Sequence, residues 1–177
     1  MNKNIVLTLL VLTSLLLLSS CGIIGSVNKA IGGIGGGISV NEDQKADARM
    51  EQIISAIKDN DKDALKALFS KKALDEDSSF DNELDNLFEF IQGNVDTWTR
   101  DGLAGDGDIE YGKKSMMIRF PINVSTDKNN YEFYVIDYYT DTINPDNQGV
   151  YMLEVKLKGA PNTGSWQERM RAGIYIH

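Results

Sequence analysis

The sequence has few of the residues that form disulfides, metal centres and basic surfaces. Its 177 residues include one cysteine, one histidine and three prolines. A single cysteine excludes an intrachain disulfide and a cysteine-based metal cluster. The 18 basic residues are outnumbered by 26 acidic ones, giving a formal net charge of −8. This charge argues against a nucleic-acid partner, because such proteins need a basic surface to replace phosphate counterions.

The single histidine further restricts the chemistry. His177 follows every predicted strand, so we expect no His–Asp dyad in the core, no Ser-His-Asp or Cys-His arrangement and no zinc site. A calcium-binding EF-hand loop that began in the acidic segment 59–63, at Asp59, would need glycine at position 64 and glutamate at position 70. The sequence has Ala64 and Ser70 there. Helix capping therefore explains this segment better. We expect no metal and no cofactor.

Residues 1–20 have the pattern of a targeting segment. Lys3 precedes an apolar run from Ile5 to Leu18, which is shorter than the ~20 residues that a membrane-spanning helix needs. The run ends in Leu18-Ser19-Ser20-Cys21, which resembles the lipobox of bacterial lipoproteins. The resemblance implies a cleaved signal peptide over 1–20 and acyl chains such as palmitate on Cys21. The protein would then be anchored on the extracytoplasmic face of a cell membrane. The alternative is an ordinary secretory signal with an unrelated cysteine near the cleavage site.

A glycine-rich segment follows the cysteine. Residues 22–37 contain seven glycines and four isoleucines. Glycine-rich chains behave as flexible coil, so we interpret residues 21–40 as a tether that carries the lipidated Cys21. The tether is either a simple spacer or a segment whose isoleucines enter the lipid headgroup region.

Residues 41–177 have the pattern of one folded domain. Apolar spacing predicts a helix over 43–58, a second with Asp61 as its N-cap and Leu65, Leu68 and Phe69 on its apolar face, and a third from about Ser79. Alternation predicts strands over 116–124, 131–142 and 151–157, and a weaker, glycine-interrupted strand over 95–100 and 109–112. This order is typical of an α+β domain with N-terminal helices packed on an antiparallel sheet.

The first two predicted helices also carry a resemblance. Residues 46–61, followed by Ala64-Leu65-Lys66-Ala67-Leu68-Phe69-Ser70, resemble the opening of nuclear-transport-factor-2-like (cystatin-like) domains. The chain as a whole is similar to an uncharacterised group of bacterial lipoproteins that carry such a domain. The resemblance implies a bent sheet that forms a cone, with room for a pocket between helices and sheet. Members of that superfamily include isomerases, dehydratases, ligand-binding modules and protein-binding modules, so the fold does not select a function.

Asp137 is the residue that we nominate for an active or ligand site, together with Tyr139 on the same strand. If the strand is regular, one face carries Tyr131, Phe133, Val135, Asp137 and Tyr139. On an inner face, a desolvated carboxylate has a raised pKa, as a general base or ligand anchor requires. In the opposite phase Tyr134, Ile136 and Tyr138 point inward and Asp137 is solvated. Because both faces carry apolar residues, the sequence leaves both phases open. For an inward Asp137 it offers Arg119 as one partner.

Two tryptophans and an acidic segment have alternative interpretations. Trp98 is either a core aromatic or a pocket wall, and Trp166 either covers the mouth of a cone or packs conventionally. Alternate residues Asp106, Asp108 and Glu110 would share one face of a strand, as a weak cation site or, more simply, as a solvated hairpin.

These observations predict a membrane-anchored, non-catalytic module that binds an unidentified protein or small molecule. The alternatives are an isomerase- or dehydratase-type enzyme that uses a cone pocket, and an inhibitor or immunity-type protein whose acidic surface meets a basic partner.

Overall fold

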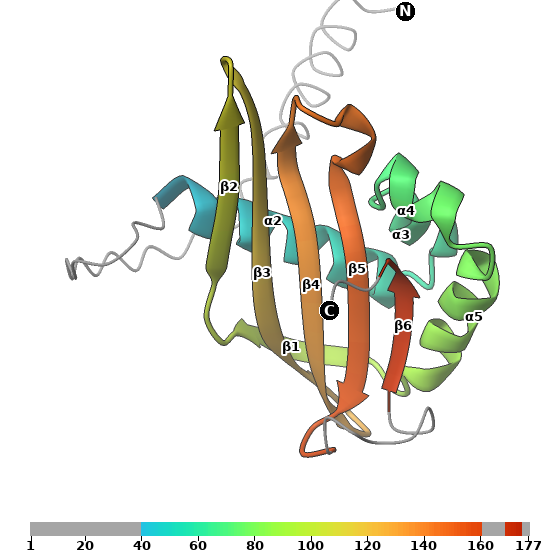
Figure 1. Ribbon diagram of the computed structural model, residues 1–177. Helices are drawn as coiled ribbons and strands as arrows, with labels where there is room; N and C mark the ends of the chain where they lie inside the picture. Colours follow the sequence, from blue (N-terminus) through green and yellow to red (C-terminus); the bar gives the residue numbers. More distant parts are fainter. Residues whose placement is uncertain (1–39, 161–168, 175–177) are drawn as a thin grey trace, which may run out of the picture. The chain divides into compact units, whose positions relative to one another are not determined.

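The computed structural model describes residues 40–160 and 169–174 (Figure 1). The chain divides between residues 35 and 36, and every described residue belongs to the second unit. No helix in these two ranges is both long and apolar enough to cross a membrane. The described elements are, in order, α2 (Val40–Lys58), α3 (Lys62–Lys66), α4 (Lys71–Glu76), α5 (Phe80–Phe90), β1 (Val95–Arg100), β2 (Ala104–Glu110), β3 (Lys113–Thr126), β4 (Asn130–Asp141), the 3-10 helix η1 (Pro145–Asn147), β5 (Gly149–Leu157) and β6 (Arg169–Gly173).

The strands form one open, curved antiparallel sheet in the order β1-β3-β4-β5-β6. β2 shares the β1 side of β3: β1 pairs with residues 122–126 of β3 and β2 with residues 113–119. Figure 1 shows β1 crossing the lower ends of the other strands, whereas β2 runs alongside β3. The predicted α+β class with an antiparallel sheet is confirmed.

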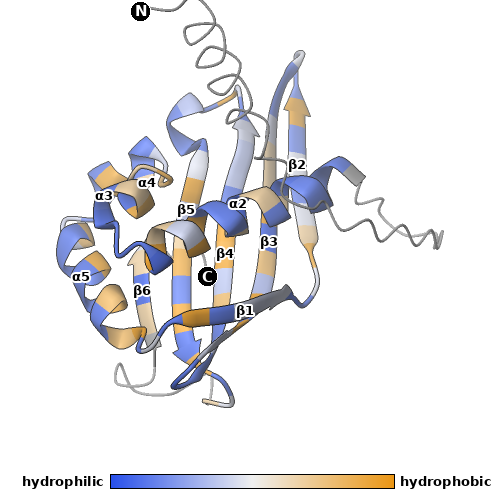
Figure 2. Ribbon diagram, turned by 180° about the vertical axis from the view of Figure 1, so that it is seen from behind, coloured by the Kyte–Doolittle hydropathy of each residue, from blue (hydrophilic) through white to orange (hydrophobic). Residues whose placement is uncertain are grey.

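The main core lies between the helices and the inner face of this sheet. α2 crosses the inner face (Figure 2), and α5 packs against β6. The apolar residues at helical spacing in the sequence form the helix side of this main core, and the alternating apolar residues of the strands form its sheet side. Among its fully buried residues are Ala46, Met50 and Ile53 of α2, Ile118, Phe120, Ile122 and Val124 of β3, and Phe133 and Val135 of β4.

The helices agree with the sequence analysis in position but not in number. The Asp61 side chain accepts a hydrogen bond from the Ala64 N–H at 2.8 Å, which confirms the predicted N-cap. The second predicted helix is shorter than expected, however, because α3 ends at Lys66 and leaves Leu68 and Phe69 outside it. The separate helix α4 was not predicted. The Ser70 N–H donates to the Val150 carbonyl of β5 at 2.9 Å, so the backbone here pairs with the sheet instead of continuing a helix. The Ser70 hydroxyl then caps α4.

The strands also differ from the prediction at the edges of the sheet. The single glycine-interrupted strand predicted over 95–100 and 109–112 is in fact two strands, β1 and β2, which pair with different parts of β3. β2 begins earlier than predicted, at Ala104, and stops at Glu110, and residues 111–112 form the turn to β3. Tyr111 and Gly112 have φ values of +48° and +81°, which is the geometry of a two-residue type I′ hairpin. β6 was not predicted from the sequence at all, because its five residues carry only a brief alternation.

Candidate functional site

Asp137 lies on the inner face of β4, under α2. Only 1% of the residue is exposed, and its Oδ2 accepts a hydrogen bond from Arg49 Nε at 3.1 Å. Arg49 comes from α2, and a second of its donors, Nη1, reaches Gln52 at 3.1 Å. The inward phase of the strand is therefore the one that the protein adopts. The outer face of the same strand carries Ile136 in a separate apolar cluster.

The charge state of Asp137 is set by two opposing effects. Burial raises its pKa, while the charge and hydrogen bond of Arg49 and the nearby charge of Lys45 lower it, and the net direction is upward. Its Oδ1 atom is buried and has no hydrogen-bond partner among the described residues. Asp137 is thus a desolvated carboxylate held by a single guanidinium contact.

Tyr139 contacts the same helix closer to its N-terminus, at Lys45 and Glu42, which lie about one and two turns before Arg49. The register between β3 and β4 skips Tyr139, and its hydroxyl donates to Glu42 Oε1 at 2.9 Å. Lys45 Nζ lies 4.2 Å from the centre of the Tyr139 ring, a cation–π contact. Burial and the Glu42 carboxylate raise the pKa of Tyr139 to about 12, so the phenol stays protonated at neutral pH.

The sequence analysis did not identify the α2 side of this cluster. Glu42, Lys45 and Arg49 follow one another at three- and four-residue spacing, beside the apolar stripe of α2. That spacing was the available signal, but polar residues beside an apolar stripe are common on helices. The prediction that Arg119 could pair with an inward Asp137 is wrong. Arg119 pairs in register with Ile136 on the outer face, where its Nη2 reaches Asp106 Oδ2 at 3.2 Å.

The other residues nominated from sequence do not join this cluster. Trp98 is half-buried on β1, pairs with Val124 in register and packs against the main core, as the core-aromatic interpretation requires. Trp166 and Cys21 lie outside the described residues. The structure thus brings together Asp137 and Tyr139, but not the tryptophans.

Two hollows open near the ends of α2 and α5, away from Asp137. The first, of about 450 Å³, is lined by Asn86, Glu89, Phe90, Gln92, Asn129, Tyr131, Leu157 and Met170. The second, of about 370 Å³, is lined by Ile57, Lys58, Asn60, Phe88, Ile91, Gly93, Asn94 and Val95. The Tyr131 hydroxyl at the first hollow donates to the Phe90 carbonyl at 3.1 Å and accepts from the Gln92 N–H at 2.8 Å. This hydroxyl has a structural role and is not available as an acid or base.

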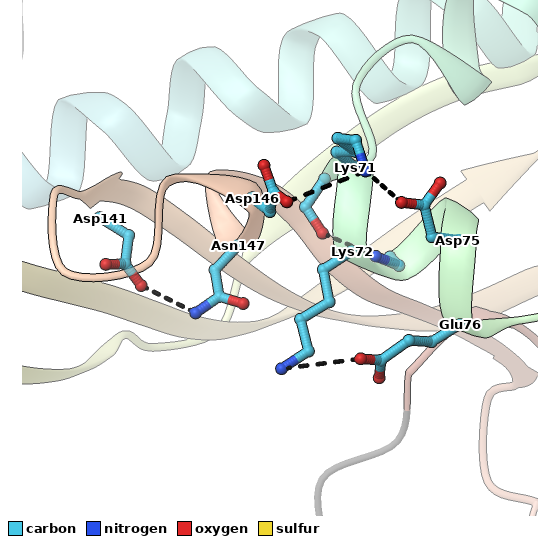
Figure 3. Close-up of polar contacts among 9 residues, drawn as sticks. Lys71, Lys72, Asp75, Glu76, Asp141, Asp146 and Asn147 are labelled. Carbon is cyan, nitrogen blue, oxygen red and sulfur yellow. Dashed lines mark hydrogen bonds and ion pairs between the residues drawn. The ribbon is translucent and has the colours of Figure 1, made fainter.

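A polar junction joins α4 to the η1 turn (Figure 3). Lys71 pairs with Asp75 and lies 3.8 Å from Asp146, while Lys72 lies 3.9 Å from Glu76. Each of these side chains is at least 38% exposed. Exposed pairs of this kind are worth roughly 0–1 kcal/mol, so the junction orients α4 weakly and does not form a binding site.

Asp141, at the end of β4, contrasts with Asp137. It is buried, but its carboxylate accepts hydrogen bonds from the N–H groups of Ile143 and Asn144, the Asn147 amide and the Ser115 hydroxyl. Burial alone would raise the pKa of Asp141, but these donors outweigh it and lower the pKa. Asp141 is therefore a turn-forming carboxylate with its bonding capacity used.

The outer face of β2 and β3 holds a small acidic hollow. About 190 Å³ of space is lined by Asp106, Gly107, Asp108, Ser115, Met117 and Tyr138. Asp106, Asp108 and Glu110 share the outer face of β2, as the alternation predicted, and every residue of the strand is exposed. Within the described ranges, no group of three or more histidine, cysteine, aspartate or glutamate side chains is arranged to hold a metal ion. The solvated-hairpin interpretation fits this segment.

The tip of the β2–β3 hairpin exposes apolar side chains. Ile109 is 73% exposed and Tyr111 is fully exposed. Leu157, at 36%, is the other large apolar residue that stands out among the described residues. Ile109 and Tyr111 thus lie two residues apart at one exposed hairpin tip.

Residues 52–159 match the family described as Domain of unknown function (DUF5104). The match covers more than half of the chain, and the protein belongs to this family. No curated protein matches the chain.

Proposed function

We propose that the protein is a lipid-anchored, extracytoplasmic module that binds another protein and has no catalytic activity. The observation that carries the non-catalytic part is the pairing of Asp137 with Arg49 beneath α2. A general base needs an accessible lone pair near substrate. The Asp137 side chain is 2% exposed, and neither hollow at the ends of α2 and α5 is lined by it.

Tyr139 supports the same proposal. Its hydroxyl is already bonded to Glu42 at 2.9 Å, and the raised pKa of Tyr139, about 12, makes it a weaker acid than an ordinary tyrosine. The inner face between α2 and the sheet is occupied by packed apolar side chains. The polar groups on this face hold α2 against β4.

The binding part of the proposal is supported by the hairpin tip and by the charge of the chain. Ile109 and Tyr111 are exposed at this tip, and Asp106, Asp108 and Glu110 are exposed on the outer face of the same strand, β2. With a formal net charge of −8, the surface favours a partner of positive charge.

We also infer kinship with the nuclear-transport-factor-2-like cone folds. Helices that precede a curved antiparallel sheet and pack on its inner face support this inference. Within that fold, this chain would be a member whose cone interior is filled.

The anchor is tested at Cys21. The Cys21→Ser variant should lose incorporation of an alkyne-labelled palmitate and leave the membrane fraction, because the acyl chains supply the attachment. A Ser20→Ala variant, which keeps a small residue beside the cysteine, is the matched control and should label as wild type does. Membrane partitioning of Cys21→Ser equal to that of wild type would show that the lipobox interpretation is wrong.

Protein binding is tested in intact cells by photo-crosslinking from the tip. A Tyr111→benzoylphenylalanine variant should give a discrete protein adduct on irradiation. The control is Asp63→benzoylphenylalanine, at an exposed position on α3, and should give none. Identical adducts from both positions, or none from position 111, would contradict the proposed binding surface.

A further inference from the structure

β2 is an edge strand of the described sheet. Among the described strands it pairs only with β3. The two-residue turn makes Glu110 and Lys113 the closing pair of the hairpin, and backbone groups of an antiparallel strand alternate in direction. The backbone N–H and C=O groups of Gly105, Gly107 and Ile109 therefore point away from β3. One of these groups, the Gly107 N–H, already donates to the Asp106 side chain at 2.9 Å, a local contact that main-chain pairing with an added strand would replace.

We propose that this edge is a docking site at which an extended segment of a partner protein adds as a further strand, with lysine or arginine at alternate positions. The inference rests on the proposed protein-binding function and specifies the chemistry of the partner. Strand addition supplies affinity through main-chain hydrogen bonds, while side chains at alternate positions supply specificity.

The carboxylates of β2 supply the charge complementarity. Asp106 is 65% exposed and already contacts Arg119, but Asp108 and Glu110 have no ion-pair partner among the described residues. All three project on the outer face, next to the side chains that an added strand would place there. A strand with basic residues at every second position would match them one to one.

The acidic hollow adds a recess for one of those basic side chains. Met117 and Tyr138 contribute apolar surface to it, and Asp106 and Asp108 contribute carboxylates. Lysine and arginine have an apolar stem and a charged end, so one such side chain can cover the apolar surface while its charge meets a carboxylate.

A second copy of this chain is a poor occupant. Antiparallel self-pairing centred on Gly107 would place Asp106 of each copy directly opposite Asp108 of the other. Like charges in opposed positions destabilise a strand pair. β2 also carries neither proline nor lysine, the residues that commonly protect edge strands, so a basic strand is not excluded.

The test uses the mature protein and an acetylated, amidated peptide with the sequence Lys-Val-Lys-Val-Lys-Val-Lys, labelled for fluorescence anisotropy. The decisive variant is Gly105→Pro, which removes an outward N–H, with Gly105→Ala as its matched control. A Cβ at position 105 would lie 3.6 Å from Glu42 Oε1, an ordinary contact, so Gly105→Ala should fold. Gly105→Pro removes an N–H that makes no bond to β3, and thermal denaturation checks that this variant folds. We expect at least tenfold weaker binding for Gly105→Pro and less than a twofold change for Gly105→Ala.

Charge recognition is tested in the same assay. Asp108→Asn should weaken binding about threefold or more, whereas Asp63→Asn on α3 makes the same charge change elsewhere and should leave the affinity unchanged. A peptide with glutamate in place of lysine should not bind. If Gly105→Pro proves unfolded by thermal denaturation, Ile109→Pro against Ile109→Ala repeats the test at the next but one outward N–H.

The outcomes separate this inference from the function on which it rests. Equal binding by the proline and alanine variants, or equal losses for Asp108→Asn and Asp63→Asn, would reduce the interaction to non-specific charge attraction and overturn it. A concentration-dependent dimer that Gly105→Pro abolishes would make the second copy the occupant and also overturn it. Failure of the peptide to bind while the Tyr111 adduct persists would overturn strand addition and leave the proposed protein-binding function standing.

Discussion

Replacing Arg49 with methionine should destabilise the fold more than replacing Asp137 with asparagine. Arg49→Met keeps an apolar stem but leaves the Asp137 carboxylate, at 2% side-chain exposure, without its only hydrogen-bond donor among the described residues. Removing one partner of a buried pair costs about 3–5 kcal/mol, and we expect about 3 because Lys45 remains nearby. Asp137→Asn instead leaves Arg49, which is 20% exposed and keeps its contact with Gln52. We expect that variant to lose about 1 kcal/mol.

The pH dependence of this loss follows from the direction of the pKa shift. Burial raises the pKa of folded Asp137 above its unfolded value of about 3.9, and loss of Arg49 raises it further. A group with a raised folded pKa contributes stability that is fully present below the unfolded pKa and is lost as the pH rises through the folded pKa. The gap between Arg49→Met and wild type should therefore be widest at pH 7 and narrow toward pH 4.

Urea unfolding at pH 7, 5.5 and 4 measures both effects. The double variant Arg49→Met/Asp137→Leu should recover much of the loss at pH 7, because no charge is then left buried. Lys62→Met breaks an exposed pair with Asp85 and serves as the control, with an expected loss below about 1 kcal/mol. A loss for Arg49→Met that is the same at every pH, or no greater than that for Asp137→Asn, would refute this account of the pair.

Two further predictions concern the packing around the sheet. Tyr139→Phe removes the hydrogen bond to Glu42 and should cost about 1 kcal/mol, and an ultraviolet pH titration should lose the tyrosine whose pKa is about 12. No change in either measurement would contradict the contact. Gly149 has a φ of +126°, and a Cβ there would lie 2.9 Å from the backbone N of Ser70, so Gly149→Ala should cost more than about 2 kcal/mol in urea unfolding. Gly102→Ala, with a φ of +110° and open space around it, should cost about 1 kcal/mol, and equal losses would show that steric contact at Gly149 is unimportant.

The local pattern of the sequence determined most of the elements. Helical spacing of apolar residues located α2 and α5, and alternation located the long strands β3, β4 and β5. Asp61 was recognisable as an N-cap because capping depends on residues only three apart. Such features depend on neighbours along the chain, so a single sequence carries them in full.

Local sequence information could not predict which face of β4 points inward. Tyr131, Phe133 and Val135 on one face compete with Tyr134, Ile136 and Tyr138 on the other, and both sets are large and apolar. Both faces are in fact used: the first set joins the main core and the second joins an outer cluster with Met117 and Met152. Alternation alone predicts one buried face, so it could not show which face of β4 lies against the main core.

Tertiary structure alone decided which groups meet Asp137. Arg49 is 88 residues away in sequence, whereas Arg119, 18 positions away in the numbering, lies on the opposite face of the sheet. Likewise, α3 ends before α4 because the backbone of Leu68 and Ser70 forms hydrogen bonds with Val150 of β5, and no local sequence pattern predicts these bonds. The sequence by itself thus determined which segments are helices and strands and which residue was worth examining. The partner of that residue, its burial and the open edge of β2 depended on how α2 crosses the sheet and on which side of β3 each strand pairs, and these are non-local contacts.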